Sequence, residues 1–235
     1  MAKKNKEISS SNLIKVKPIT EGQKSVFETW KKGQNQFLFG CAGTGKTFIS
    51  LYLAMQDVLD LKTKYDKVIL VRSLIPTREI GFLPGDEEDK AALYQVPYQN
   101  MVKFMFEQPN EQAFNMLYDR LKNQGSLYFL STSFLRGLTF DNSIIIVDEC
   151  QNLNFHEVDT ITTRVGQDSK IVFCGDFSQT DLLKQNEKNG LHDFLRILME
   201  MQEFNCIEFN IGDIVRSGFV RNYLIQKTKL GMGME

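Results

Sequence analysis

The sequence predicts an α/β fold, in which a parallel β-sheet is covered by helices on both faces. Short apolar runs recur along the 235 residues, and most are separated by segments with helical spacing of apolar residues. The connections exceed a dozen residues, the length that a crossover between parallel strands needs. Several runs are apolar throughout, as in strands buried on both faces. We expect strands at residues 36–39, 67–71, 127–131, 143–147, 170–174 and 206–209.

The composition is that of one globular domain. Hydrophobic residues make up 42% of the chain, charged residues 24%, and the net charge is -1. This balance gives no electrostatic case for binding nucleic acid or an anionic membrane surface. Residues 1–17 are polar and basic, so we expect a flexible arm there. The domain is predicted to span residues 18–230, followed by a tail at 231–235.

Neither secretion nor a membrane span is expected from the sequence. The N-terminus lacks the apolar core of a signal peptide, and no uninterrupted apolar run reaches spanning length. The cysteines are far apart and form no CxxC pair, which is typical of reduced thiols rather than a zinc site. We therefore expect a cytoplasmic protein without a structural metal; its cysteines are Cys41, Cys150, Cys174 and Cys206.

Two further helical regions are predicted, one before the first strand and one after the second. Thr20 is suited to cap a helix that ends at Gly33, before the first strand. The segment from residue 73 to 125 is too long for a simple crossover, so it predicts an insertion after the second strand. Its apolar residues indicate amphipathic helices: Tyr94, Tyr98, Met101, Phe104, Met105 and Phe106.

A glycine-rich loop follows the first predicted strand and opens the next helix. It matches G-x-x-x-x-G-K-[ST], the P-loop pattern, without a mismatch. Backbone N–H groups of such a loop converge on phosphates, aided by the helix dipole. We expect Lys46 to contact the β and γ phosphates and Thr47 to bind magnesium; a glycine turn that only caps a helix is the alternative. The loop consists of Gly40, Cys41, Ala42, Gly43, Thr44, Gly45, Lys46 and Thr47.

Acidic and polar residues follow two later strands. Asp148 and Glu149 come directly after the run at 144–147, where α/β sheets place their ligands. Asp148 is the expected magnesium partner and Glu149 the general base, which favours hydrolysis over phosphoryl transfer to a metabolite. Capping of a helix by two acids is the alternative. After the next strand, Gln179 is predicted to hydrogen-bond the γ phosphate.

Taken together, GCAGTGKT, IIIVDECQN and FCGDFSQTD resemble the PhoH family. Its single P-loop domain, a RecA-like parallel sheet flanked by helices, is related to the first motor domain of superfamily-one helicases. RSLIPTREIGFLPG at 72–85, TRVG at 163–166 and DIVR at 213–216 also match the family. The resemblance covers about residues 18–230 and implies a P-loop ATPase that uses ATP and Mg²⁺.

The resemblance also implies how the ATP site is completed. Gln23 resembles a glutamine that reads adenine in related helicases. The family implies ring-shaped oligomers, here a homo-hexamer, with ATP between subunits and an arginine reaching across from a neighbour. Arg164, Arg216 and Arg72 are the candidates, in that order, and a surface salt bridge is the alternative role for each.

Single-stranded RNA is the ligand that the resemblance favours, with single-stranded DNA left open. The basic arm and the aromatic residues Phe82, Tyr94 and Tyr98 are candidate contacts, although core packing is the more common role of such aromatics. The chain has one P-loop and no length for a second motor domain, so a monomeric helicase is not expected. A nucleotide-dependent regulatory switch and a small-molecule kinase are the other functions considered.

Overall fold

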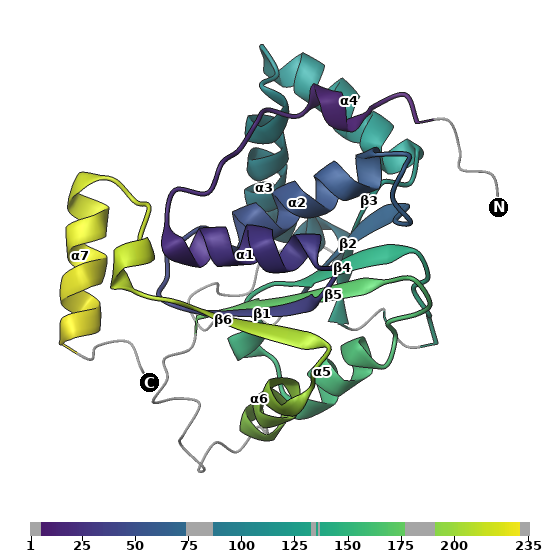
Figure 1. Cartoon of the computed structure of the whole chain (residues 1–235). Helices are drawn as coiled ribbons and strands as arrows, with labels where there is room; N and C mark the ends of the chain where they lie inside the picture. Colours follow the sequence, from purple (N-terminus) through teal and green to yellow (C-terminus); the bar gives the residue numbers. More distant parts are fainter. Residues whose placement is uncertain (1–5, 74–86, 133–134, 136, 177–190, 231–235) are drawn as a thin grey trace.

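The computed structural model describes residues 6–73, 87–132, 135, 137–176 and 191–230, and these fold around one parallel sheet (Figure 1). All of its strand pairs are parallel, in the order β3-β2-β4-β5-β1-β6. The predicted α/β fold is confirmed, with strand ends displaced by at most two residues. The strands are β1 (Asn35–Gly40), β2 (Lys67–Arg72), β3 (Leu127–Ser131), β4 (Ser143–Val147), β5 (Lys170–Gly175) and β6 (Phe204–Phe209).

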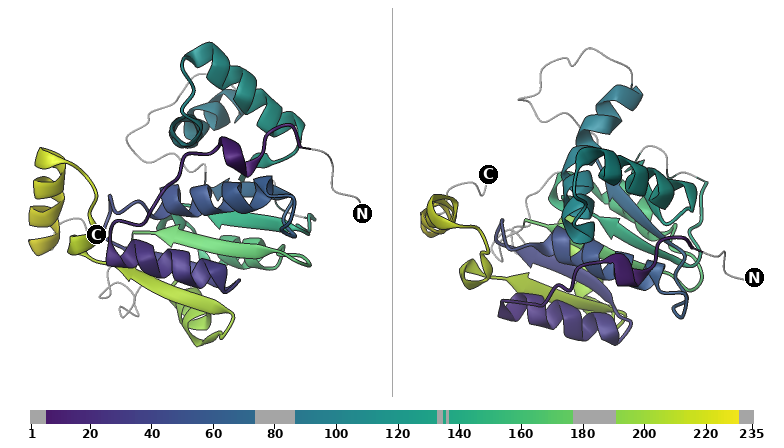
Figure 2. Two further views of the ribbon diagram at one scale, coloured as in Figure 1. Left: turned by 45° about the horizontal axis from the view of Figure 1, so that its top comes forward. Right: turned by 90° about the horizontal axis from the view of Figure 1, so that it is seen from above.

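Helices cover both faces of the sheet, as Figure 2 shows in two further views. One face carries α1 (Glu21–Lys31), α2 (Lys46–Leu59), α3 (Glu87–Phe106) and α4 (Glu111–Asn123). The other face carries α5 (Phe155–Thr162) and α6 (Leu191–Glu200), while α7 (Gly218–Lys229) stands beside the carboxyl ends of β1 and β6. Short 3-10 helices lie at Ser10–Asn12, Cys150–Asn152 and Ile211–Asp213. No described helix is long and apolar enough to cross a membrane.

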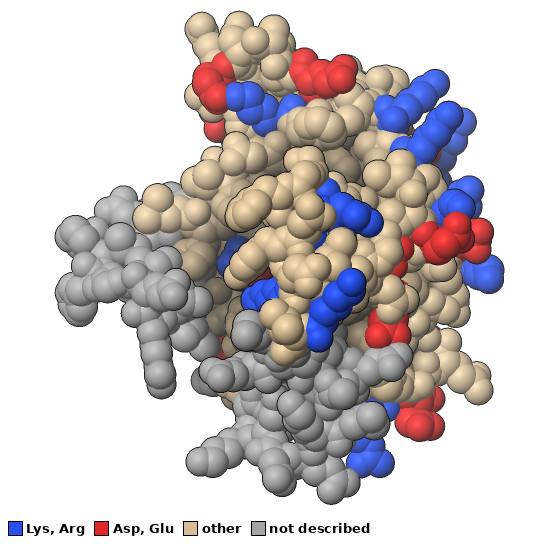
Figure 3. Space-filling view, turned by 90° about the vertical axis from the view of Figure 1, so that its left-hand side faces the viewer, with Lys and Arg blue, Asp and Glu red and all other residues tan. Residues whose placement is uncertain are grey.

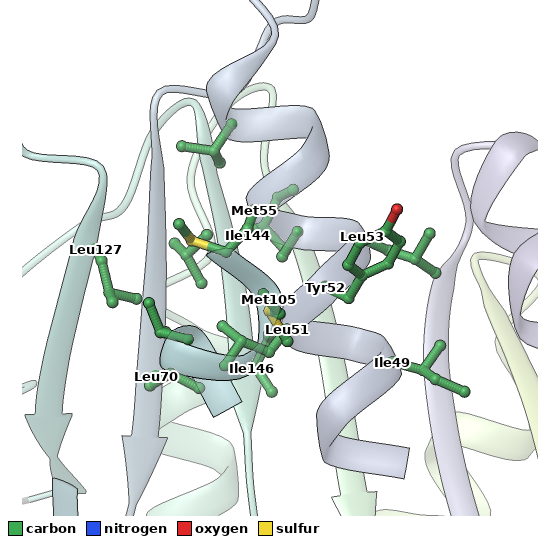
Figure 4. Close-up of a cluster of buried hydrophobic side chains, with 14 of the residues drawn as sticks. Ile49, Leu51, Tyr52, Leu53, Met55, Leu70, Met105, Leu127, Ile144 and Ile146 are labelled. Atoms are coloured by element: carbon green, nitrogen blue, oxygen red, sulfur yellow. The ribbon is translucent and has the colours of Figure 1, made fainter. Parts of the chain in front are cut away.

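The sheet is buried because successive strand residues point into two separate cores. In β4, Ile144 and Ile146 pack under α2, whereas Ile145 and Val147 pack under α5 and α6. Figure 4 shows the first of these cores, in which side chains of α2 lie over β2 and β4 and meet Met105 from α3. Burial of each such aliphatic side chain contributes about 1.5–3 kcal/mol. The all-apolar strands identified in the sequence are therefore the centre of the fold.

The N-terminal segment, residues 6–17, has contacts with the rest of the domain in the region where the sequence predicts a flexible arm. Ile8 and Leu13 are buried in the core beneath α2 and α3. The backbone N–H of Ile14 donates to the carbonyl of Met105 at 2.8 Å, and the Tyr52 hydroxyl donates to the carbonyl of Ile14 at 3.0 Å. The few apolar residues in this polar stretch are enough to fix it, because they find a hydrophobic surface formed by distant elements.

The helical insertion after β2 is confirmed as α3 and α4. Asn110 caps α4 by accepting a hydrogen bond from the N–H of Ala113, and Phe114 and Leu121 turn inward. In α3, Val102 and Met105 are fully buried, whereas Phe104 is 61% exposed. The insertion thus lies against the same face of the sheet as α2 and brings the middle of α3 close to the carboxyl edge.

Candidate functional site

The P-loop joins β1 to α2, and its backbone requires glycine. Gly45, the residue before α2, has a φ of 87°, and Gly43 has a φ of 73°, a region that favours glycine. Gly40 has a φ of 112°, and a Cβ there would lie 2.2 Å from the carbonyl oxygen of Phe209 in β6. The loop is therefore shaped by close approach to β6 as well as by its own turn.

Lys46, the first residue of α2, is folded back into the loop and is only 6% exposed. Its ammonium donates to the carbonyl oxygens of Gly40 at 3.2 Å and Cys41 at 2.8 Å. It also forms an ion pair with Asp176 at the end of β5, with 2.7 Å between Nζ and Oδ1. A carboxylate oxygen thus lies where this lysine would meet a phosphate oxygen.

Asp148 follows β4 and faces the same loop. Its Oδ1 accepts a hydrogen bond from the Thr47 hydroxyl at 2.6 Å, so the two predicted magnesium ligands lie side by side. Carboxylate and hydroxyl oxygens are the donors that magnesium prefers. These two residues therefore fit a magnesium site that phosphate oxygens and water would complete.

Tyr98 in α3 holds the other oxygen of Asp148. The phenol donates to Oδ2 at 2.7 Å, and Tyr98 is only 2% exposed. Burial, and next the charge of Asp148, raise the pKa of Tyr98 well above its ordinary value, so the hydroxyl stays protonated and remains a donor. The sequence motifs did not point to this contact, which places Tyr98 at the site.

Glu149 adopts the left-handed conformation, with φ 52° and ψ 41°, which is uncommon for a residue other than glycine. Its Oε2 accepts a hydrogen bond from Gln151 Nε2 at 2.6 Å, while Gln151 Oε1 accepts one from the N–H of Asp176 at 3.1 Å. Burial, followed by the charges of Asp148 and Asp176, raises the pKa of Glu149. A raised pKa makes the carboxylate a stronger proton acceptor.

One cavity of about 690 Å³ joins these groups. Its floor is residues 43–49 of the P-loop and α2, and Asp148, Glu149 and Asp176 line one side. The cavity is also lined by Val16, Lys17 and Ile19 from the N-terminal part of the chain and by Pro97, Tyr98 and Met101 of α3. The volume is within the range of small-molecule sites. Figure 3 views this carboxyl edge of the molecule, where basic side chains lie near the middle of the face.

Gln23, the residue predicted to contact adenine, lines the cavity beside the P-loop. The side chain is 4% exposed and both ends of its amide are engaged. Its Nε2 donates to the carbonyl of Thr44 at 3.1 Å, and its Oε1 accepts from the N–H of Ile19 at 2.9 Å. In this arrangement Gln23 ties α1 and the N-terminal segment to the P-loop.

The candidate arginines separate into two groups. Arg72 and Arg216 line the cavity of their own chain, and Arg216 packs so close to Gly43 that a Cβ there would lie 3.0 Å from Arg216 Cγ. Arg164 follows α5 near the amino ends of β4 and β5, where its carbonyl accepts from the N–H of Phe140 at 2.9 Å, so it is remote from the cavity. Gln179 lies outside the described residues.

Asp176 is the second site residue that sequence reasoning did not single out. Its position directly after β5, one strand away from Asp148, was the available signal, because the carboxyl ends of neighbouring parallel strands meet at one edge. Tyr98 gave no comparable signal, since a tyrosine within an apolar helical stretch is more often a core residue.

Comparison with known proteins identifies a family that this chain resembles over most of its length. The model of the PhoH-like protein family matches residues 15–226. Protein PhoH2 of Bacillus subtilis is 37% identical over 145 residues, covering 61% of this chain and 32% of that protein. A PhoH-like protein of Synechocystis is 31% identical over 207 residues, covering 88% of this chain and 60% of that protein. The chain thus spans 60% or less of the length of these relatives.

A solved structure shares the fold at much lower sequence identity. The large terminase of a thermophilic bacteriophage superposes with a TM-score of 0.51 and 12% identity, covering 90% of this chain and 50% of the terminase chain. At this identity the likeness concerns the fold alone. With the family model matching most of its length and the P-loop and acidic pair meeting in one cavity, the chain belongs to the PhoH family.

Proposed function

We propose that the protein hydrolyses ATP with magnesium at the cavity between the P-loop and β4. The observation that carries the proposal is the convergence of Lys46, Thr47, Asp148 and Glu149 on this one cavity. Each residue has the chemistry that its place requires: a cation for phosphates, two oxygens for a metal ion, and a carboxylate of raised pKa for a water molecule.

Binding begins with an exchange of partners at Lys46. The phosphates replace the Asp176 carboxylate at the ammonium, which then balances their negative charge. Magnesium, when bound at Thr47 and Asp148, neutralises phosphate charge. Glu149 accepts a proton from the attacking water as the water oxygen bonds to the γ phosphorus and the bond to the bridging oxygen breaks, giving ADP and inorganic phosphate.

The preference for ATP over other nucleoside triphosphates rests on the family and on Gln23. A side-chain amide can both donate to and accept from the edge of adenine. Gln23 would exchange its contacts with Ile19 and Thr44 for such a pair, and both contacts lie within reach of the cavity. Replacement of Gln23 by alanine is therefore expected to weaken discrimination between ATP and GTP.

We further propose that the active form is a homo-hexameric ring that acts on single-stranded RNA. The family resemblance supports both the ring and the ligand. The position of Arg164 agrees with a head-to-tail ring, because a residue far from its own cavity can reach a site only in a neighbouring subunit. Arg72 and Arg216 already line the cavity of their own chain and would act there.

A nucleotide-dependent switch is the second candidate, and the Lys46–Asp176 ion pair favours it. Asp176 directly follows β5 and is linked through Gln151 to Glu149, so displacement of Asp176 by a phosphate would alter the hydrogen bond that holds Glu149. A small-molecule kinase finds less support, because a general base for water beside the phosphates promotes loss of the phosphoryl group to solvent.

One set of assays separates these functions. ATP turnover is measured with and without magnesium and single-stranded RNA, in the wild type, in Lys46→Ala and in the exposed-lysine control Lys31→Ala, with the oligomeric mass recorded in each buffer. We expect the wild type to be a hexamer whose ATP turnover depends on magnesium and is stimulated by RNA. Turnover should fall at least about 100-fold in Lys46→Ala and remain unchanged in Lys31→Ala. Slow turnover in a monomer indifferent to RNA would favour the switch, and a phosphorylated metabolite the kinase.

A further inference from the structure

The helical insertion supplies a side chain to the metal-binding carboxylate. We propose that Tyr98 of α3 is a positioning residue that fixes Asp148 for magnesium and thereby makes the insertion part of the nucleotide site. The inference rests on the proposed function, since it assigns a role at that same site. The hydrogen bond of 2.7 Å between the Tyr98 hydroxyl and Asp148 Oδ2 supports this role.

The two oxygens of Asp148 have different partners. Oδ1 faces Thr47, the other predicted metal ligand, whereas Oδ2 faces α3. A carboxylate held at one oxygen cannot rotate freely, so the hydrogen bond from Tyr98 leaves Oδ1 directed toward Thr47. Outer partners of this kind orient metal ligands, and their loss typically costs 10-fold to 100-fold in metal affinity or activity.

Tyr98 is itself held in place by its surroundings. Its ring packs against Phe129 of β3, with 5.7 Å between the centroids, and the residue is almost fully buried. Arg72 at the end of β2 lies nearby, where its charge acts on the phenol, and its guanidinium lies 5.7 Å from the centroid of the Tyr94 ring, one helical turn earlier in α3. The phenol therefore cannot leave Asp148 without disturbing the contact between α3 and the sheet.

This arrangement couples the insertion to occupancy of the metal site. Asp148 follows β4, in the middle of the sheet, while α3 belongs to a segment inserted after β2. A change in the position of Asp148 acts directly on its hydrogen bond with Tyr98. A shift of α3 in turn changes the orientation of the Asp148 carboxylate. A ligand or partner bound to the insertion would thus change magnesium affinity through one hydrogen bond.

The test measures nucleotide binding rather than turnover. The dissociation constant of a non-hydrolysable ATP analogue is determined with magnesium and with EDTA. The value in EDTA divided by the value with magnesium reports how much magnesium tightens binding. Tyr98→Phe keeps the ring and removes the hydroxyl. We expect this ratio to fall about 10-fold in Tyr98→Phe, with affinity in EDTA unchanged within about twofold.

Tyr118→Phe is the matched control, because Tyr118 is a buried tyrosine of the same insertion that lies outside the cavity. Its magnesium ratio should equal that of the wild type. An unchanged ratio in Tyr98→Phe would overturn the positioning role while leaving the proposed function intact. A wild type whose nucleotide binding gains nothing from magnesium would instead contradict the proposed function.

Hydrogen exchange in the wild type gives an independent test that does not depend on the variant folding. Amides of residues 94–105 in α3 should exchange more slowly with the ATP analogue and magnesium than with the analogue and EDTA. Equal protection in the two conditions would overturn the coupling between the metal site and the insertion.

Discussion

Gly40 shows how a single residue joins the P-loop to the sheet. Its φ of 112° and the close approach of the Phe209 carbonyl leave no room for a side chain. We expect Gly40→Ala to lower the free energy of unfolding by at least about 2 kcal/mol, because the new Cβ collides with backbone that cannot move aside. Thermal and urea unfolding measure the effect.

Gly212 provides the control for that change. Nothing lies within 4 Å of a Cβ built on Gly212, so Gly212→Ala should change stability by no more than about 0.5 kcal/mol. Equal stability of Gly40→Ala and the wild type would show that the loop and β6 are less tightly joined than their geometry indicates.

Lys170 is a buried cation that the proposed chemistry does not use. It is 1% exposed, donates to the carbonyl of Trp30 at 3.2 Å and lies 4.1 Å from the centroid of the Trp30 ring. Burial lowers the pKa of Lys170 to about 8. The native state therefore binds fewer protons than the unfolded state between about pH 8 and the ordinary lysine pKa, and stability rises with pH across that interval.

We expect the free energy of unfolding of the wild type to gain about 2 kcal/mol relative to Lys170→Met between about pH 7.5 and 9.5. The carbonyl of Trp30 keeps a hydrogen bond from the N–H of Gly33 in the variant, so no buried acceptor is left unpaired. Urea unfolding at several pH values measures the difference, with the exposed-lysine variant Lys24→Met as control. Parallel pH profiles of the wild type and Lys170→Met would contradict the assignment.

At the level of single residues, the sequence could indicate those site residues that belong to a recognisable motif. Thr47 and Asp148 were expected to share a metal ion, and they lie in direct contact. Tyr98 and Asp176 were not identified, because their roles depend on how an insertion and a neighbouring strand pack in three dimensions. Arg164 illustrates the same limit, since its motif says nothing of which edge of the sheet it occupies.

At the scale of the elements, the N-terminal segment packs against the domain although its composition is mostly polar. The Tyr52 hydroxyl accepts from the N–H of Val16 at 3.2 Å and donates to the carbonyl of Ile14 at 3.0 Å, so one side chain of α2 fixes two backbone groups. Val16, Lys17 and Ile19 then form one wall of the nucleotide cavity. Secondary-structure patterns do not predict this packing, because the segment has almost no regular structure of its own.

We expect Tyr52→Phe to destabilise the protein by about 1 kcal/mol and to accelerate exchange of the Val16 amide, since both hydrogen bonds are lost. Nucleotide affinity should fall as well, because the wall of the cavity loosens. Hydrogen exchange and nucleotide titration measure the two effects, with Tyr128→Phe, a partly exposed tyrosine of β3, as control. Unchanged exchange at Val16 would show that Tyr52 does not hold the segment.

At the scale of the whole molecule, the sheet order explains why distant residues meet. β4 and β5 lie next to each other and β5 borders β1, so Asp148, Asp176 and the P-loop come from three adjacent strands. The strands and crossovers were predictable because apolar runs and crossover lengths report them directly. The path of the insertion over the cavity was not predictable from the sequence, because it depends on contacts such as those of Tyr98 with Asp148 and Phe129.

In the proposed mechanism, Glu149 activates the attacking water at a site that the P-loop and Asp148 complete. The most direct test compares Glu149→Gln with the wild type and with Glu200→Gln, an exposed acid on α6, in both nucleotide affinity and single-turnover hydrolysis of ATP with magnesium. We expect Glu149→Gln to bind nucleotide within about threefold of the wild-type affinity and to hydrolyse ATP at least about 100-fold more slowly, whereas Glu200→Gln should match the wild type. Hydrolysis at the wild-type rate in Glu149→Gln would contradict the role of Glu149 as the general base.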